Sequence, residues 1–168
     1  MIRERWPGDG AALEAMARRT HDLDGYPKYL PRDLRAFIVN ADAIGAWVSV
    51  VDGELRGHVA LRPKSAPEVM ALAVSATGLS EDKIAVVARL LVSPSARRQG
   101  IGRALLEKAT RVAAQLGRRA VLDVVEDHRA AVALYEKCGW TRAGRADWTL
   151  PDGLPLHELV YVSPDPGL

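Results

Sequence analysis

The segment best suited to bind a charged ligand runs from Arg97 to Arg103, between an apolar stretch and an amphipathic one. It carries three arginines and two glycines, Gly100 and Gly102, where a helix is predicted to begin. The first N–H groups of a helix have no internal partner, and the helix dipole places about half a positive charge there. Glycine lets a ligand approach the backbone closely. The segment therefore predicts a phosphate site at the start of a helix.

Motifs that this segment lacks exclude some classes of phosphate ligand. No Gly-Lys-Ser/Thr sequence follows, so it is not a Walker loop, and Leu105 stands where a dinucleotide fingerprint has its third glycine. A plain connection between a strand and a helix, with solvated arginines, is the alternative interpretation. A nucleotide-binding α/β enzyme that uses the same loop is a further one.

The elements around the segment predict how it is held. Residues 84–92 are almost continuously apolar, which indicates a central strand covered on both faces. Residues 102–116 show a helical stripe that ends at Gly117. A buried strand over 119–125 and a helix over 128–138 follow. Two strand–helix units of this kind imply parallel crossovers and therefore an α/β or α+β domain with a mixed sheet.

The rest of the chain predicts the remaining elements. Asp52-Gly53 is a strong signal for a hairpin turn. The long excursion over residues 63–83 separates two strands, and such excursions are often functional. The other predictions are a strand at 2–6, helices at 10–19 and 32–40, an irregular loop at 21–31, hairpin strands at 43–51 and 54–61, a helix at 66–77 and a strand pair at 140–145 and 156–162.

Length and composition limit the class of protein. The 168 residues and the 48% hydrophobic share fit one domain over residues 1–168, with a frayed tail at 163–168. A net charge of +2 does not favour nucleic acid or a membrane surface, and no window approaches a membrane span. The single cysteine, Cys138, excludes an internal disulfide and a cysteine-based metal site, so no metal is expected. We expect a cytoplasmic protein, because the charged start of the sequence is unlike a signal peptide.

Two motifs together resemble the GNAT superfamily of N-acetyltransferases. The first is Arg97-x-x-Gly100-x-Gly102 after Leu90-Leu91-Val92-x-Pro94, which is similar to the family's pyrophosphate motif. The second covers residues 128–140 and looks like the family pattern Asn-x-x-Ala-x-x-Leu-Tyr-x-x-x-Gly-Phe, with His128 in place of asparagine. The resemblance implies a mixed, splayed central sheet of about seven strands flanked by helices. It also implies acetyl-CoA as cosubstrate.

The resemblance also assigns roles to residues. The strand edge at Leu90, Leu91 and Val92 would pair with the pantetheine arm, with an oxyanion donor among the N–H groups near Val92. Tyr135 would assist the departing thiolate, since a phenol with a pKa of about 10 is protonated at neutral pH. The implied cofactor contacts are Leu90, Leu91, Val92, Arg97, Arg98, Gln99, Gly100, Ile101, Gly102, Arg103, His128, Ala131 and Tyr135.

The acceptor is expected to be a primary amine on a small molecule or a peptide. By the resemblance, the acceptor site is built largely from the first two helices, the loop between them and the last strand pair. Here His21, Asp22, Tyr26 and Tyr29 offer charge and aromatic faces to a cationic amine. An ordinary polar loop is the alternative. The segment 66–77 within the excursion either covers the acceptor site or extends a contact between copies of the protein, so a homodimer is one of the expectations.

The sequence does not identify the general base. Some family members carry a glutamate on the strand before the loop, but residues 85–89 contain no carboxylate. Glu126, Asp127, Glu54, His21 and Asp22 are the alternatives. The missing glutamate is also the only sequence support for a different function, a non-catalytic sensor or scaffold module that binds acyl-CoA.

Overall fold

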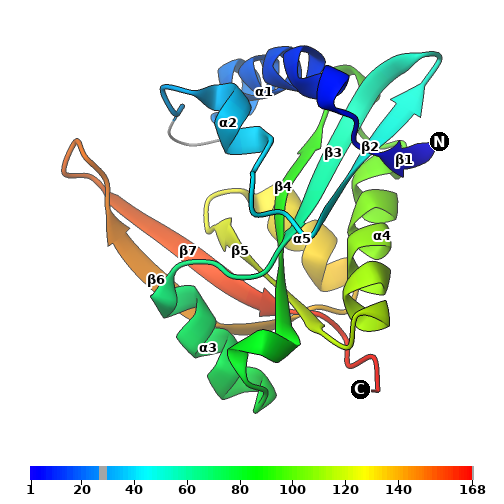
Figure 1. Ribbon diagram of the computed structural model, residues 1–168. Helices are drawn as coiled ribbons and strands as arrows, with labels where there is room; N and C mark the ends of the chain where they lie inside the picture. Colours follow the sequence, from blue (N-terminus) through cyan, green and yellow to red (C-terminus); the bar gives the residue numbers. More distant parts are fainter. Residues whose placement is uncertain (27–29, 168) are drawn as a thin grey trace. The chain divides into compact units, whose positions relative to one another are not determined.

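The elements follow the order expected from the sequence. A computed structural model describes residues 1–26 and 30–167, and Figure 1 shows its helices and strands coloured along the chain. The strands of these described residues form a seven-stranded sheet in the order β1-β2-β3-β4-β5-β7-β6. Their bounds are β1 (Ile2–Glu4), β2 (Gly45–Val51), β3 (Glu54–Arg62), β4 (Ile84–Val92), β5 (Arg119–Val125), β6 (Thr141–Thr149) and β7 (Pro155–Val162). The helices are α1 (Gly10–Asp24), α2 (Leu34–Ile38), α3 (Pro67–Thr77), α4 (Ile101–Gln115) and α5 (Arg129–Lys137).

The sheet combines both strand directions. Strands β4 and β5 are parallel, with Ile84 opposite Arg119 and Val86 opposite Val121. The pairs β1–β2, β2–β3, β5–β7 and β6–β7 are antiparallel. Parallel neighbours need a long crossover, and α4 supplies it between β4 and β5. The expected mixed sheet of seven strands flanked by helices is confirmed.

The internal contacts divide the chain into two compact units, each made of two segments. Unit 1 comprises residues 1–62 and 88–109, and unit 2 comprises residues 63–87 and 110–168. Strand β4 and helix α4 each contribute residues to both units. The single domain expected over residues 1–168 stays a prediction.

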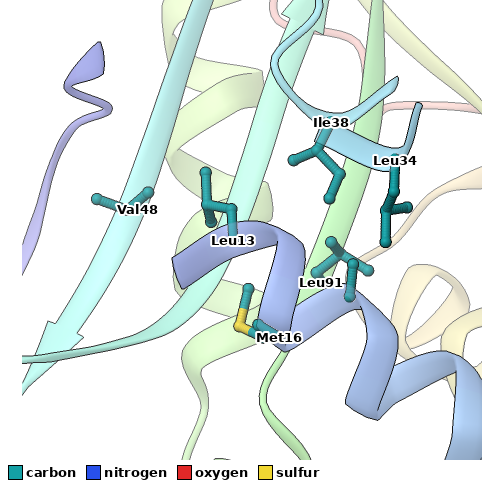
Figure 2. Close-up of a cluster of buried hydrophobic side chains, with 7 residues drawn as sticks. Leu13, Met16, Leu34, Ile38, Val48 and Leu91 are labelled. Carbon is teal, nitrogen blue, oxygen red and sulfur yellow. The ribbon is translucent and has the colours of Figure 1, made fainter. Parts of the chain in front are cut away.

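The core of unit 1 joins two helices to two strands. Helix α1 supplies apolar side chains three and four residues apart, the spacing of one helix face. Leu91 of β4 belongs to the same cluster, so the end of the strand before the basic loop is anchored in this core. The buried members, most of which Figure 2 labels, are Leu13, Met16, Ala17, Leu34, Ile38, Val48 and Leu91.

Helix α1 is longer than the sequence predicted, because it ends at Asp24 and not at Arg19. The Thr20 hydroxyl is buried and donates to the Met16 carbonyl at 2.8 Å, so this polar residue continues the helix. Gly25 then adopts a left-handed φ of 70° and donates its N–H to the His21 carbonyl. This is a helix C-cap. Residues 21–24, expected in an irregular loop, are therefore helical.

Helix α3 is the helix predicted within the excursion at 63–83. Met70 and Ala73 lie in the core of unit 2 with Ile84 and Val86 of β4 and Val121 of β5. The helix also contacts β6 and β7 (Figure 1). Its apolar face is thus part of the core of unit 2.

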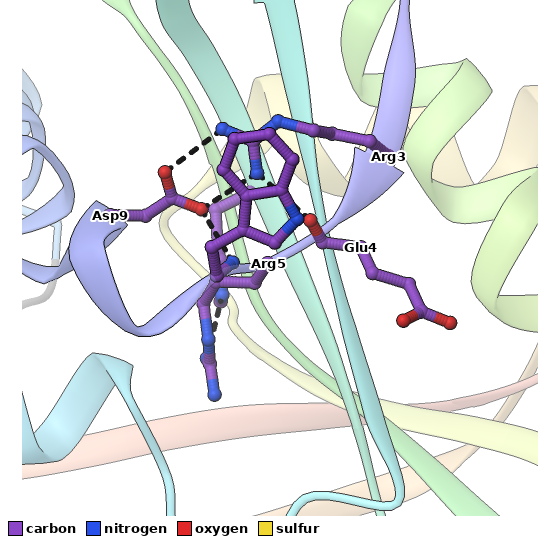
Figure 3. A network of polar contacts seen from close by, with 6 residues as sticks. Arg3, Glu4, Arg5 and Asp9 are labelled. Atoms are coloured by element: carbon purple, nitrogen blue, oxygen red, sulfur yellow. Dashed lines mark hydrogen bonds and ion pairs between the residues drawn. The ribbon is translucent and has the colours of Figure 1, made fainter.

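A polar network joins β1 to the start of α1. Arg3 donates two hydrogen bonds to Asp9, at 2.8 and 2.9 Å, and its guanidinium lies 3.7 Å above the centre of the Trp6 ring (Figure 3). Asp9 also accepts from the Trp6 N–H at 2.7 Å. The hydrogen bond from Arg3 lowers the pKa of Asp9. The carboxylate therefore stays ionised and fixes the entry into α1.

Gly57 lets β3 lie close to the first turns of α4. A Cβ atom there would stand 2.7 Å from Leu105 Cδ1, 2.8 Å from Ile101 Cγ2 and 3.2 Å from the Leu91 carbonyl oxygen. Leu105 is fully buried and cannot turn aside freely. We expect Gly57→Ala to lower the free energy of unfolding by about 2 kcal/mol through overpacking.

Urea unfolding of Gly57→Ala beside Gly8→Ala tests this prediction. A Cβ at Gly8 would meet nothing within 4 Å, so that variant should stay within about 0.5 kcal/mol of the parent protein. Equal stability of the two variants would show that the packing between β3 and α4 accepts an added methyl group at Gly57.

Candidate active site

The basic loop begins where β4 ends. The Ser93 N–H donates to the Arg56 carbonyl of β3 at 2.8 Å, and Pro94–Ala96 form one 3-10 turn. Residues 97–100 are exposed. The carbonyl of Gly100 then accepts from the Ala104 N–H at 3.0 Å, which is the first helical hydrogen bond of α4. The loop thus leads directly into a helix of 15 residues, as predicted.

The backbone of the loop contains two left-handed residues. Arg98 has φ of 61° and Gly100 has φ of 77°, so two positions that flank Gln99 are left-handed. Such conformations turn successive N–H groups toward a common concavity, where a phosphate oxygen is favoured. Space is open at Gly100, because a Cβ there would meet nothing within 4 Å. An anion can therefore approach the backbone of the loop closely at Gly100.

The arginines of the loop differ in their partners. Arg97 forms an ion pair with Asp24 at the end of α1, and this bond raises the pKa of Arg97. Arg103 pairs with Glu107 one turn later at 2.8 Å. Within residues 1–26 and 30–167, Arg98 has no carboxylate partner. Sequence reasoning did not predict that Asp24 pairs with Arg97, since nothing in the sequence links two residues 73 positions apart.

The side chains at the end of β4 alternate between buried and half-buried positions. Leu91 is buried against α1 and α2, whereas Leu90 and Val92 are half-buried. Just before Leu90, Arg89 has a φ of 55° inside the strand. The strand expected to bind the pantetheine arm therefore contains a left-handed residue, Arg89, directly before the expected contact residues that begin at Leu90.

The second motif lies in unit 2, on and beside α5. His128 is the residue before the helix, and Ala131 and Tyr135 follow on the same face, three and seven positions on. The Tyr135 ring is buried, with its centroid 6.2 Å from both the Trp140 and the Tyr161 rings. The helix predicted at 128–138 is confirmed as α5, and it presents the Tyr135 ring to two other aromatic rings.

The expected acceptor residues lie in different surroundings. His21 is half-buried and Asp22 exposed in the last turn of α1, and Tyr26 is half-buried and packs against the core of unit 1. Tyr29 lies outside the described residues. Among the candidate bases, Glu54 is paired with Arg56 at 2.6 Å, and Glu126 lies 3.9 Å from Arg145.

His58 of β3 is a fully buried histidine. Burial lowers its pKa from the ordinary 6.5 to about 4, although the hydrogen bond to the Arg89 carbonyl opposes this shift. His58 in the unfolded chain thus binds a proton near its ordinary pKa of 6.5, whereas His58 in the folded chain binds one only near its lowered pKa of about 4. The contribution of His58 to the free energy of unfolding is therefore fully present above the unfolded pKa, and it is lost as the pH falls toward the folded pKa.

We expect the free energy of unfolding to decrease when the pH is lowered from about 7 to about 5. The decrease should be about 2 kcal/mol larger in the parent protein than in His58→Asn. Urea unfolding at both pH values measures the difference between the two slopes. The difference in slope is independent of the absolute stability of the variant. Parallel curves would mean that His58 titrates normally in the folded protein.

These features define a class of protein. A basic, glycine-bearing loop leads from β4 into α4, and a tyrosine-bearing helix, α5, follows later in the chain. This order of motifs suits a coenzyme A-dependent acyltransferase. The family model of the acetyltransferase (GNAT) family matches residues 11–140, and the chain belongs to that family. The expected N-acetyltransferase class and acetyl-CoA as cosubstrate are thereby confirmed.

Solved structures share the fold across nearly the whole chain. The ribosomal-protein-S18-alanine N-acetyltransferase from Escherichia coli is 20% identical, with a TM-score of 0.69 over 100% of this chain and 97% of that one. NAA60 from Arabidopsis thaliana, in complex with acetyl-CoA, is 21% identical, with a TM-score of 0.70 over 96% of each chain. An N-acetyltransferase from Staphylococcus aureus is 18% identical, with a TM-score of 0.73 over 96% of each chain. No curated protein matches in sequence. Among the described residues, no helix is both long and apolar enough to cross a membrane.

Proposed function

We propose that this protein transfers the acetyl group of acetyl-CoA directly to a primary amine. The amine nitrogen attacks the thioester carbonyl carbon, so that a C–N bond forms and the C–S bond breaks. The CoA sulfur leaves with a proton, and the amine nitrogen loses one. No nucleophilic side chain is required for this direct attack.

The observation that supports the proposal most is the backbone of the basic loop. The left-handed residues Arg98 and Gly100 stand directly before a long helix, whose first N–H groups favour a phosphate. The N–H groups of residues 98–103 would hold the pyrophosphate, and Arg98 would add a charge-assisted contact. The cofactor contacts at Gln99, Ile101, Gly102, His128 and Ala131 are part of the same proposal.

Tyr135 is proposed to donate a hydrogen bond to the departing sulfur. It occupies the tyrosine position of the second motif, and its buried ring packs near two other aromatic rings. A buried position favours hydrogen bonding over competition with water. Leu90, Leu91 and Val92 would pair with the pantetheine arm, and an N–H group near Val92 would stabilise the oxyanion.

The acceptor is proposed to be an amine of a small molecule or a peptide. Asp22 is exposed at the end of α1, where its charge suits a cationic group, and His21 and Tyr26 lie within five residues of it. The homodimer and the cytoplasmic location expected from the sequence stay predictions.

Calorimetric titration of the protein with acetyl-CoA, with ATP and NAD as controls, tests the proposal. We expect acetyl-CoA alone to bind. Incubation with a panel of amines and peptides, followed by mass spectrometry, should then give an acetylated product. Binding without transfer to any amine would favour the acyl-CoA sensor, and preferential binding of ATP or NAD would overturn the cofactor assignment.

A further inference from the structure

Strand β4 contains a backbone conformation that its sequence does not favour. Arg89 has a φ of 55°, in the left-handed region that side chains with a Cβ rarely adopt. It directly precedes Leu90, the first residue proposed to pair with the pantetheine arm. Conformations of this kind persist only where the surrounding structure imposes them. The contacts around Arg89 must therefore supply that constraint.

His58 and Phe37 hold Arg89 in place. The Arg89 carbonyl oxygen lies 2.9 Å from Nδ1 of His58, and its Nε donates to the Phe37 carbonyl at 2.9 Å. Its guanidinium also lies 3.6 Å above the centre of the Phe37 ring. The Phe37 contacts fix the side chain, whereas the His58 contact is made to the main chain at the left-handed residue itself.

The two neighbours of the His58 ring determine its protonation. A carbonyl oxygen only accepts, so Nδ1 carries the proton and donates to Arg89. Arg5 Nη1 lies 3.1 Å from Nε2, and a guanidinium only donates, so Nε2 is the acceptor. Arg5 also donates to the Ile38 carbonyl at 3.2 Å, and Figure 3 shows its side chain. His58 is therefore a neutral ring of one tautomer, held from both sides in a fully buried position.

We infer that His58 is a positioning residue for acetyl transfer: its Nδ1–H fixes the Arg89 carbonyl and so sets the direction in which β4 presents Leu90–Val92 to the thioester arm. This inference rests on the proposed function. The basic loop starts only at Arg97, after the hydrogen bond from Ser93 to β3 and the 3-10 turn at Pro94–Ala96. The pyrophosphate contacts therefore depend less on the His58 hydrogen bond than the thioester contacts do.

The experiment compares His58→Leu, which removes both hydrogen bonds, with His58→Asn, whose Nδ2 stands in the place of Nδ1. We expect His58→Leu to lower kcat by about tenfold or more, because small misplacements of reacting groups are costly, and to change the acetyl-CoA Kd by less than about threefold. His58→Asn should recover most of the lost kcat. Met70→Ala in the core of unit 2 is the control for lost stability, and its kcat per folded molecule should not change.

A double-mutant cycle with Arg89→Gly isolates the mechanism, because glycine adopts positive φ without help. His58→Leu should lower kcat by less than about threefold in the Arg89→Gly background. An equal loss in both backgrounds, or a parallel loss of kcat in Met70→Ala, would overturn the inference.

Hydrogen exchange of the Leu90 and Leu91 amides, measured without ligand, separates this inference from the proposed function. We expect faster exchange in His58→Leu than in the parent protein and in His58→Asn. Unchanged exchange would overturn the role of His58 even in an active enzyme. A parent protein that binds no acetyl-CoA would overturn the proposed function, and with it the part of the inference that concerns acetyl transfer.

Discussion

Tyr135→Phe is expected to lower kcat for acetyl transfer by about 100-fold, while the Kd for acetyl-CoA changes by less than about threefold. The substitution removes one hydroxyl group and keeps the aromatic ring. The packing against Trp140 and Tyr161 is therefore preserved. The proposed hydrogen bond to the leaving sulfur is lost, and this loss affects the transition state more than the bound ground state.

Tyr161→Phe is the matched control for this prediction. Tyr161 is also buried, and its hydroxyl donates to Glu136 at 2.8 Å. Loss of that bond should lower the free energy of unfolding by about 1 kcal/mol and leave kcat within about twofold. Steady-state kinetics with the acceptor at saturation, together with urea unfolding, measures both variants. A kcat in Tyr135→Phe that equals that of Tyr161→Phe would remove Tyr135 from the chemistry.

Gly100→Ala is expected to weaken acetyl-CoA binding by about tenfold, which corresponds to about 1.4 kcal/mol. At a φ of 77° alanine is strained. Relief of that strain would rotate the neighbouring N–H groups away from the phosphate. The added methyl group would also fill the open space through which the phosphate approaches the backbone.

Gly117→Ala separates lost stability from lost binding. Gly117 follows the end of α4, has a φ of 71° and has equally open space around its Cβ position. Both variants should lose about 1 kcal/mol of stability, but only Gly100→Ala should bind acetyl-CoA more weakly. Calorimetry on both variants measures the difference, and equal Kd values would place the pyrophosphate elsewhere.

The parts that the sequence predicted best depend on local patterns. Residues 84–92 and 119–125 are mostly apolar, and residues 102–116 carry a clear helical stripe. The structure has β4, β5 and α4 at these segments, with α4 one residue earlier at each end. Gly100 could be singled out because its place between an arginine pair and a helix start needs a flexible backbone. Tyr135 could be singled out through its place in the second motif.

The parts that the sequence did not predict depend on contacts between distant residues. The pairing of Arg97 with Asp24 and the hydrogen bond from His58 to Arg89 join positions on separate elements. The end of α1 was misplaced for a different reason. The segment His21–Asp22–Leu23–Asp24 looks like polar loop, but the C-cap at Gly25 keeps it helical.

The interleaving of the two units along the chain limits how the protein can be shortened. A contiguous fragment that contains all of unit 1 must span residues 1–109, and one that contains all of unit 2 must span residues 63–168. Both fragments share residues 63–109, which include all of β4 and the whole basic loop. Cutting the chain once therefore cannot yield two fragments that each hold one complete unit, and a split-protein design would have to duplicate this shared stretch.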